Sequence, residues 1–169
     1  MKSSRKDILS LAFLVALLPP VWAVLAPHLN ISVGPTALIC AGIYGANGNK
    51  FSDALKISLG YLTGDLWALL SAVITASSAA DKLGPSLLLF LTLFVLGFLA
   101  VVIAANLPKL FFLPAWLSGW AIGMLTNTLS HGTSLLSLTI QTGAAMLVGV
   151  FYVGALVDKL QKLMAGKQS

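Results

Sequence analysis

The chain has 169 residues, of which 58% are hydrophobic and only 9% charged, and it carries a net charge of +5. Soluble domains average roughly 25% charged residues, so the composition excludes a soluble globular domain and makes the bilayer the expected solvent. The basic residues lie between apolar runs and form no stripe with interleaved aromatics, so no nucleic-acid partner is predicted. The length fits a single transmembrane domain, 1–169.

Six apolar runs approach or reach the length of about 20 residues that a helix needs to cross a bilayer. In chain order they are Ile8–Leu25, Ile31–Asn47, Leu55–Thr75, Pro85–Ala105, Leu110–Leu125 and Ser134–Val157. The second and fifth runs are short, and Pro35 and Pro114 interrupt them near their starts. A polar linker, Ser77–Gly84, joins the third run to the fourth, and residues 158–169 form a basic tail. The sequence therefore predicts an all-α membrane protein with six transmembrane helices.

The basic residues set the expected orientation. With the N-terminus inside, the inner side receives Lys2, Arg5, Lys6, Lys50, Lys56, Lys109, Lys159, Lys162 and Lys167. The outer side receives only Lys82. Short cytoplasmic loops carry an excess of lysine and arginine, so both termini and the tail 158–169 are expected in the cytoplasm. His28 and His131 then fall in outer loops.

A shift of 79 residues aligns the second half of the chain with the first without a gap. It matches Pro35 with Pro114, Leu38 with Leu117, Ile43 with Ile122, Ser58-Leu59 with Ser137-Leu138, and Thr63-Gly64 with Thr142-Gly143. Each repeat, about 8–76 and about 85–157, holds three spans, and an odd number inverts the second copy. Inverted repeats are typical of transporters whose site lies at the midplane. A duplicated scaffold without a pore is the alternative.

Asp65 is the ionisable residue that lies deepest in any of these runs, about ten residues or roughly 15 Å from the start of the third. A carboxyl at that depth is expensive and marks a solute path, a proton relay or a buried ion pair. Lys56, nine residues earlier, faces nearly the opposite side of the same helix. The candidate substrate path comprises Asp65, Thr63, Gln141, Thr142, Gly64, Gly143, Pro35 and Pro114. Alternatively, Asp65 is a hydrogen-bonded carboxyl that only ties helices together.

Small residues suggest close helix packing. Gly60-x-x-x-Gly64 and Gly119-x-x-x-Gly123 place glycines on one helix face, which favours contacts within a protomer or between protomers. A homo-oligomer is expected. The single cysteine, Cys40, excludes an intramolecular disulfide, and no cysteine or histidine spacing indicates a metal. Without a phosphate-binding glycine loop or a nucleophile–base pair, the sequence predicts neither an enzyme nor a cofactor.

Three segments resemble a known family. ALICAGIYGANG, LGYLTGDLWALL and LPAWLSGWAIG, after an apolar first helix with a tryptophan near its end, resemble the small bacterial inner-membrane proteins of the YcdZ type. These are grouped under a domain of unknown function. The resemblance covers about Leu11–Val157 and implies a bacterial inner-membrane protein of about six helices, without binding residues to carry over. Size and repeat are also similar to the six-helix channels for urea, formate and acetate, as an architectural analogy.

These features lead to one expected function and two alternatives. The expected function is a small-solute channel or facilitator of the bacterial cytoplasmic membrane, for urea, ammonia, an amine or a short amide. A strongly anionic substrate is disfavoured because Asp65 repels it. A proton-coupled transporter that uses Asp65 is one alternative, and a non-transporting scaffold or accessory subunit is the other.

Overall fold

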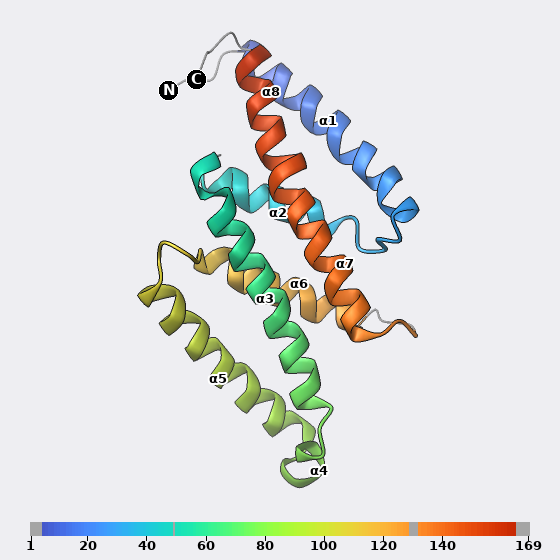
Figure 1. The fold of residues 1–169 in the computed structure, drawn as a ribbon, viewed down its shortest axis with the longest axis vertical. Coiled ribbons are helices and arrows are strands. Elements are labelled where there is room, and N and C mark those ends of the chain that lie inside the picture. The colour runs from blue at the N-terminus through green and yellow to red at the C-terminus, as the bar shows by residue number, and fades with distance from the viewer. Residues whose placement is uncertain (1–4, 49, 129–131, 165–169) are drawn as a thin grey trace. The chain divides into compact units, whose positions relative to one another are not determined.

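The computed structural model describes residues 5–48, 50–128 and 132–164, and every regular element in these ranges is helical (Figure 1). The all-α prediction is therefore confirmed. The chain forms two compact units, unit 1 with Met1–Ala54 and Ala144–Ser169, and unit 2 with Leu55–Gly143. Unit 1 combines the first two helical segments of the first predicted repeat with the end of the last segment of the second. Unit 2 combines the first two segments of the second predicted repeat with nearly all of the third segment of the first and with the start of the last segment.

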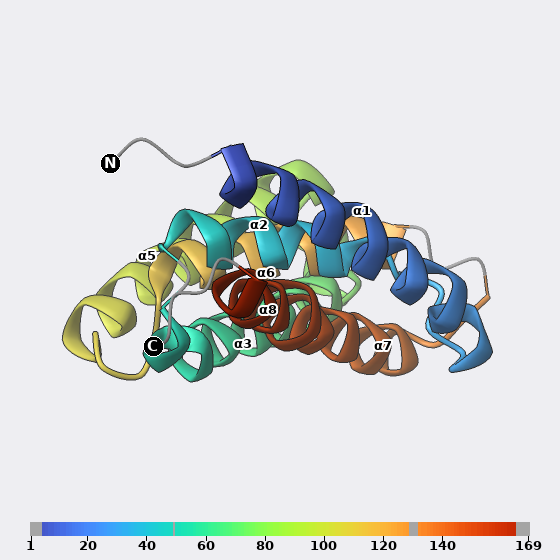
Figure 2. The same cartoon turned by 90° about the horizontal axis from the view of Figure 1, so that it is seen from above.

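Unit 1 is built from both ends of the chain. It contains α1 (Arg5–His28), α2 (Thr36–Ala46), the 3-10 turn η1 (Phe51–Asp53), the end of α7 (Leu135–Val148), the π-helix η2 (Gly149–Leu156) and α8 (Val157–Met164). Helix α1 runs antiparallel to the η2–α8 segment and contacts α8 (Figures 1 and 2). The start of α1 and the end of α8 therefore lie at the same end of unit 1.

Helix α8 occupies the first part of the predicted basic tail. The last helix continues to Met164, beyond residue 158, while residues 165–169 of the tail lie outside the described part of the chain. An ion pair of 2.7 Å between Lys162 and Asp158 spans one turn of α8. Such i,i+4 pairs support an exposed helix modestly, and contact with α1 adds to them.

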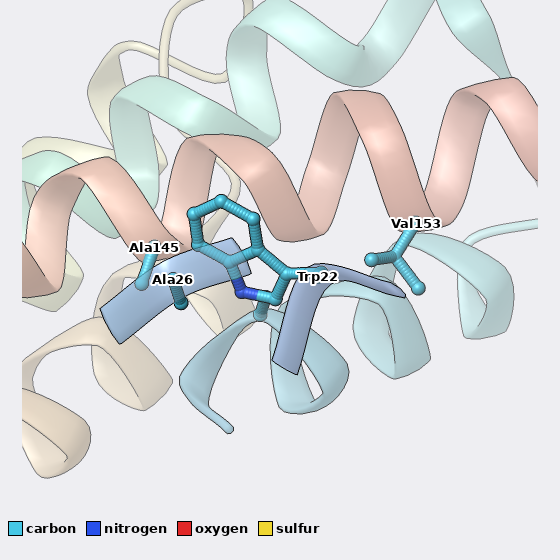
Figure 3. Close-up of a cluster of buried hydrophobic side chains, with 5 residues drawn as sticks. Trp22, Ala26, Ala145 and Val153 are labelled. Carbon is cyan, nitrogen blue, oxygen red and sulfur yellow. The ribbon is translucent and has the colours of Figure 1, made fainter. Parts of the chain in front are cut away.

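A tryptophan closes the core of unit 1 (Figure 3). Trp22 packs with a cluster of small buried side chains, namely Ala26, Ala37, Ala145 and Val153. Its indole Nε1 donates a hydrogen bond of 3.0 Å to the Gly34 carbonyl oxygen, just before α2. The apolar ring is thus buried while its polar edge is satisfied, and α1 is fixed to the start of α2.

The π-helix presents two glycines to α2. A Cβ atom on Gly149 would overlap the carbonyl oxygen of Ala37 and stand 2.7 Å from the Cβ of Cys40. A Cβ on Gly154 would stand 2.8 Å from the ring of Tyr44. Residues five apart lie about 140° apart around an α-helix, whereas i→i+5 bonding brings them closer to one face. The π segment therefore aligns both glycines with α2.

Unit 2 contains α3 (Ala54–Thr75), α4 (Ala79–Leu83), α5 (Pro85–Asn106), α6 (Leu113–Thr128) and the start of α7. Helix α6 crosses α3 where the two predicted glycine faces meet. A Cβ on Gly64 would overlap the carbonyl oxygen of Trp116, and one on Gly119 would stand 2.5 Å from the Tyr61 carbonyl oxygen. Both glycine faces are therefore occupied within one chain.

Tryptophans hold α3 to its neighbours in unit 2. Trp67 Nε1 donates to the Leu96 carbonyl oxygen of α5, and Trp120 Nε1 donates to Ser71 Oγ of α3, each at 3.0 Å. The rings of Trp67 and Trp116 meet edge to face with centroids 5.1 Å apart. These contacts join α3, α5 and α6 into one packed unit.

Four helices of the described residues are long and apolar enough to cross a membrane: Ile8–His28, Phe51–Thr75, Pro85–Asn106 and Leu135–Met164. The other two predicted spans correspond to α2, with 11 residues, and α6, with 16. At 1.5 Å per residue these reach about 16 and 24 Å, less than the roughly 30 Å of a hydrocarbon core. The four long spans are confirmed by length and composition, and the count of six stays a prediction.

Candidate functional site

Asp65 is buried near the middle of the 22-residue helix α3, with 3% of its surface exposed. Two glycines on other helices make room for its carboxyl group. Oδ1 lies 2.7 Å from the place that a Cβ on Gly123 of α6 would occupy. Oδ2 lies 3.6 Å from the corresponding place at Gly143 of α7. The carboxyl therefore occupies a cradle that a larger residue at Gly123 would fill.

The Asp65 carboxyl has few polar neighbours. No side chain among the described residues donates a hydrogen bond to it. Two apolar groups, Leu62 Cδ2 and Ala68 Cβ, lie against the same glycines, at 3.1 Å from the Cβ place of Gly143 and 2.6 Å from that of Gly123. A buried polar group without a protein partner carries an energetic cost, and an ionisable one inside an apolar helix is a candidate functional group.

Thr142, predicted for the path, is completely buried and bonds to a threonine of α6. Its hydroxyl donates to Thr126 Oγ1 at 3.2 Å, and the Thr126 hydroxyl donates to the Gly123 carbonyl oxygen at 3.0 Å. This chain of bonds joins α7 to α6 beside the two cradle glycines. Thr142 therefore fixes the position of Gly143 against α6.

Thr63 and Gln141 bond along their own helices. The Thr63 hydroxyl donates to the Leu59 carbonyl oxygen at 2.7 Å, and Gln141 Nε2 donates to Ser137 Oγ at 3.3 Å. Each lies two residues before a cradle residue, and two residues turn an α-helix by about 200°. The structure therefore brings Gly143 to Asp65 but directs Thr63 to another side of α3.

The remaining predicted path residues shape the backbone. Pro35 is the N-cap residue of α2 in unit 1, and Pro114 is the second residue of α6 in unit 2. Proline is favoured at helix starts because the first N–H groups of a helix have no partner within it, so the N–H group that proline lacks costs no hydrogen bond. Gly64 packs on the backbone of α6 at Trp116. These three residues position helices.

A groove of about 240 Å³ lies next to the cradle within unit 2. Its lining residues come from the ends of four helices and are Ala68, Ser71, Ala72, Thr75, Leu89, Met124, Asn127, Thr128 and Leu135. Ala68 belongs to both features, because its Cβ lies beside Gly123 together with Asp65 Oδ1. The groove wall and the Asp65 carboxyl are therefore separated by about one helical turn.

The sequence did not single out Gly123, Thr126 or the groove residues as a site. The sequence held a signal for Gly123, because Asp65 follows Gly64 directly. A helix that packs its glycine face on Gly64 therefore brings one of its own glycines close to Asp65. The groove had no such signal, since its residues come from four helices between positions 68 and 135 and meet only through packing. Among the described residues, no group of three or more His, Cys, Asp or Glu side chains is placed to hold a metal ion.

Long apolar helices, a buried carboxyl and glycine-mediated crossings fit a small polytopic helical membrane protein. The chain belongs to the family described as "Protein of unknown function (DUF1097)", whose model matches residues 12–162. This match agrees with the resemblance to an uncharacterised family, while no named relative supports the YcdZ label. Neither the curated proteins nor the solved structures contain a match to the chain.

Proposed function

We propose that the protein is a facilitator for a small uncharged or weakly basic solute, such as urea, ammonia, an amine or a short amide. The observation that carries the proposal is the Asp65 carboxyl, which lies in the middle of a spanning helix in a cradle of two glycines. A helix could bury leucine there at no cost. A carboxyl at this depth is costly without a polar partner, and a passing solute provides one.

The charge pattern supports this substrate class. Lys56 is the nearest basic residue of α3 and lies nine positions from Asp65, near the start of the helix. No cation on α3 therefore balances Asp65 for an anionic solute, and a carboxylate solute would meet uncompensated repulsion. A neutral or basic solute with N–H groups gains hydrogen bonds from the same carboxyl.

Proton coupling is the second candidate function, and the same isolation of Asp65 favours it. A carboxyl with no described side-chain donor has its oxygens available to take up a proton during transport. Lone ionisable groups of this kind act as proton relays in many membrane carriers. The two candidates differ in whether an amide at position 65 can replace the acid.

The proposed architecture is six crossings in two inverted repeats, with both termini in the cytoplasm of a bacterial inner membrane. Residues that are 79 positions apart make the close contacts of the two short helices, which supports the repeat. They are Ala37, Cys40 and Tyr44 of α2, and Trp116, Gly119 and Gly123 of α6. In both units a short helix lies across a glycine pair of a long one, which is the continuous helix containing η2 in unit 1 and α3 in unit 2.

A homo-oligomer is also part of the proposal. Because both glycine faces of unit 2 are used within the chain, contacts between copies fall on other apolar surfaces. Light scattering from detergent-solubilised protein measures the mass directly, and a monomer in both detergent and reconstituted membranes would contradict this part.

Solute flux into proteoliposomes tests the proposed function. The panel contains urea, methylammonium and acetamide as expected substrates and formate as the anionic control. The expected result is flux of at least one of the first three above protein-free liposomes and no flux of formate. Flux of none of the four, from folded protein, would favour the scaffold and contradict the proposal.

A further inference from the structure

The hydroxyl groups that line the groove of unit 2 all donate their proton to the backbone. Ser71 Oγ donates to the Trp67 carbonyl oxygen at 2.8 Å. Thr75 Oγ1 donates to the Ser71 carbonyl oxygen at 2.8 Å, and Thr128 Oγ1 donates to that of Leu125 at 2.7 Å. These bonds are ordinary within apolar helices, but here three of them border one groove.

Their orientation determines what the groove can offer a solute. A hydroxyl has one proton and two lone pairs, so a hydroxyl that donates to the backbone presents only lone pairs elsewhere. Ser71 already accepts one bond from Trp120 Nε1, while Thr75 and Thr128 keep acceptor capacity. Asn127 is the one lining residue whose side chain also carries N–H donors. The Asp65 carboxyl does not line the groove and lies about one helical turn away, beyond Ala68.

We propose that this groove selects solutes by their N–H donors, so that the substrate class is ureas, primary amides and amines, and acceptor-only molecules of the same shape are rejected. The inference rests on the proposed function for the assumption that the bound solute is transported, but binding itself is measured without flux. A donor-free solute places its own lone pairs against those of the threonines. Two lost neutral hydrogen bonds reduce affinity by about tenfold.

Urea, acetamide and acetone form a matched series for the test. Each is planar with four heavy atoms and one carbonyl acceptor, and they carry four, two and no N–H groups. Binding is followed by tryptophan emission of the full-length protein in lipid nanodiscs, because Trp120 bonds to Ser71 at the groove. The expected order of affinity is urea, acetamide, acetone, with about a tenfold difference between the first and last.

Variants of the groove threonines decide whether the hydroxyls cause that order. The double variant Thr75→Val and Thr128→Val keeps side-chain shape and removes both acceptors, so the urea–acetone difference should shrink several-fold. The double variant Thr75→Ser and Thr128→Ser keeps the acceptors and should retain it. The control is Thr92→Val on α5, where the buried hydroxyl also donates to its own helix, to Leu88 at 2.8 Å, outside the groove.

Three results would overturn the inference: no saturable binding of urea, equal affinity for urea and acetone, or a Thr92→Val effect as large as that of the double valine variant. If the valine variant fails to fold, the serine variant still decides, since loss of the order there contradicts the role of the acceptors. Ordered binding without flux in proteoliposomes would retain donor selection and refute the facilitator. Flux in proteoliposomes without a preference for solutes with N–H donors would retain the facilitator and refute donor selection.

Discussion

Replacing Gly64 by alanine tests the crossing that positions Asp65. The new Cβ would overlap the Trp116 carbonyl oxygen and lie 2.6 Å from the Trp120 nitrogen and 2.9 Å from the Gly119 carbonyl carbon. All three are backbone atoms of α6, so no side chain can rotate away and the helices must separate. Overpacking of this kind costs about 3 kcal/mol, and the better helix propensity of alanine returns about 1 kcal/mol. The net loss is about 2 kcal/mol.

Thermal unfolding in detergent measures this loss. For a chain of this size, each kcal/mol shifts Tm by roughly 2–4 °C, so Gly64→Ala should lower Tm by about 4–8 °C. The matched control is Gly97→Ala on α5, where the nearest atom to the new Cβ is Trp120 Cζ3 at 3.8 Å, an ordinary contact. Gly97→Ala should leave Tm unchanged or raise it. Equal Tm values for Gly64→Ala and wild type would refute the α3–α6 packing.

Two further predictions concern topology and the threonine pair. In a Cys40→Ala background, impermeant thiol reagents should label cysteines placed at Ser78 and Gly132 from outside intact cells, because the positive-inside bias puts these loops on the outer side. Labelling of Asn49→Cys or Gln168→Cys from outside would contradict the prediction that both termini lie in the cytoplasm. Thr142→Val should lower the free energy of unfolding by about 0.5–1.5 kcal/mol, because it removes the hydrogen bond to Thr126. Thr139→Val is the milder control, since the Thr139 hydroxyl donates along its own helix at 3.0 Å. Equal losses of stability in the two variants would show that the α6–α7 hydrogen bond has no special role.

Long uniform runs were predictable, because one physical signal defines them. The third and fourth spans were expected at Leu55–Thr75 and Pro85–Ala105, and the helices are Ala54–Thr75 and Pro85–Asn106. The bounds of the short helices were not predictable, since the apolar run around each one also includes residues outside the helix. The run Ile31–Asn47 contains α2 only from Thr36, because the chain first turns through residues 31–35, and a turn at Gly48, with φ +81°, follows its end.

The site was predictable in its centre but not in its surroundings. The burial of Asp65 follows from its position in a spanning run, and the structure agrees. Its neighbours depend on which helix crosses α3 and at what height, which hydropathy does not encode. The expected group of Thr63 with Asp65 relied on similar membrane depth and on the alignment of the repeats, whereas residues two positions apart on a helix face different sides. Gly123 and Gly143 can approach the carboxyl because they lack a Cβ, but which glycines do so depends on how the helices pack.

The most direct test of the central claim is the flux of the best substrate through Asp65→Leu, measured per folded molecule together with Tm. If Asp65 lines the solute path, flux should fall to the level of protein-free liposomes, while Tm holds or rises because a buried desolvated carboxyl is removed. Asp65→Asn should keep much of the flux in a facilitator and lose accumulation in a proton-coupled carrier, and Asp81→Asn, an exposed acid on α4, is the control. A lower Tm with unchanged flux per folded Asp65→Leu molecule would contradict the account and make Asp65 a tie between helices.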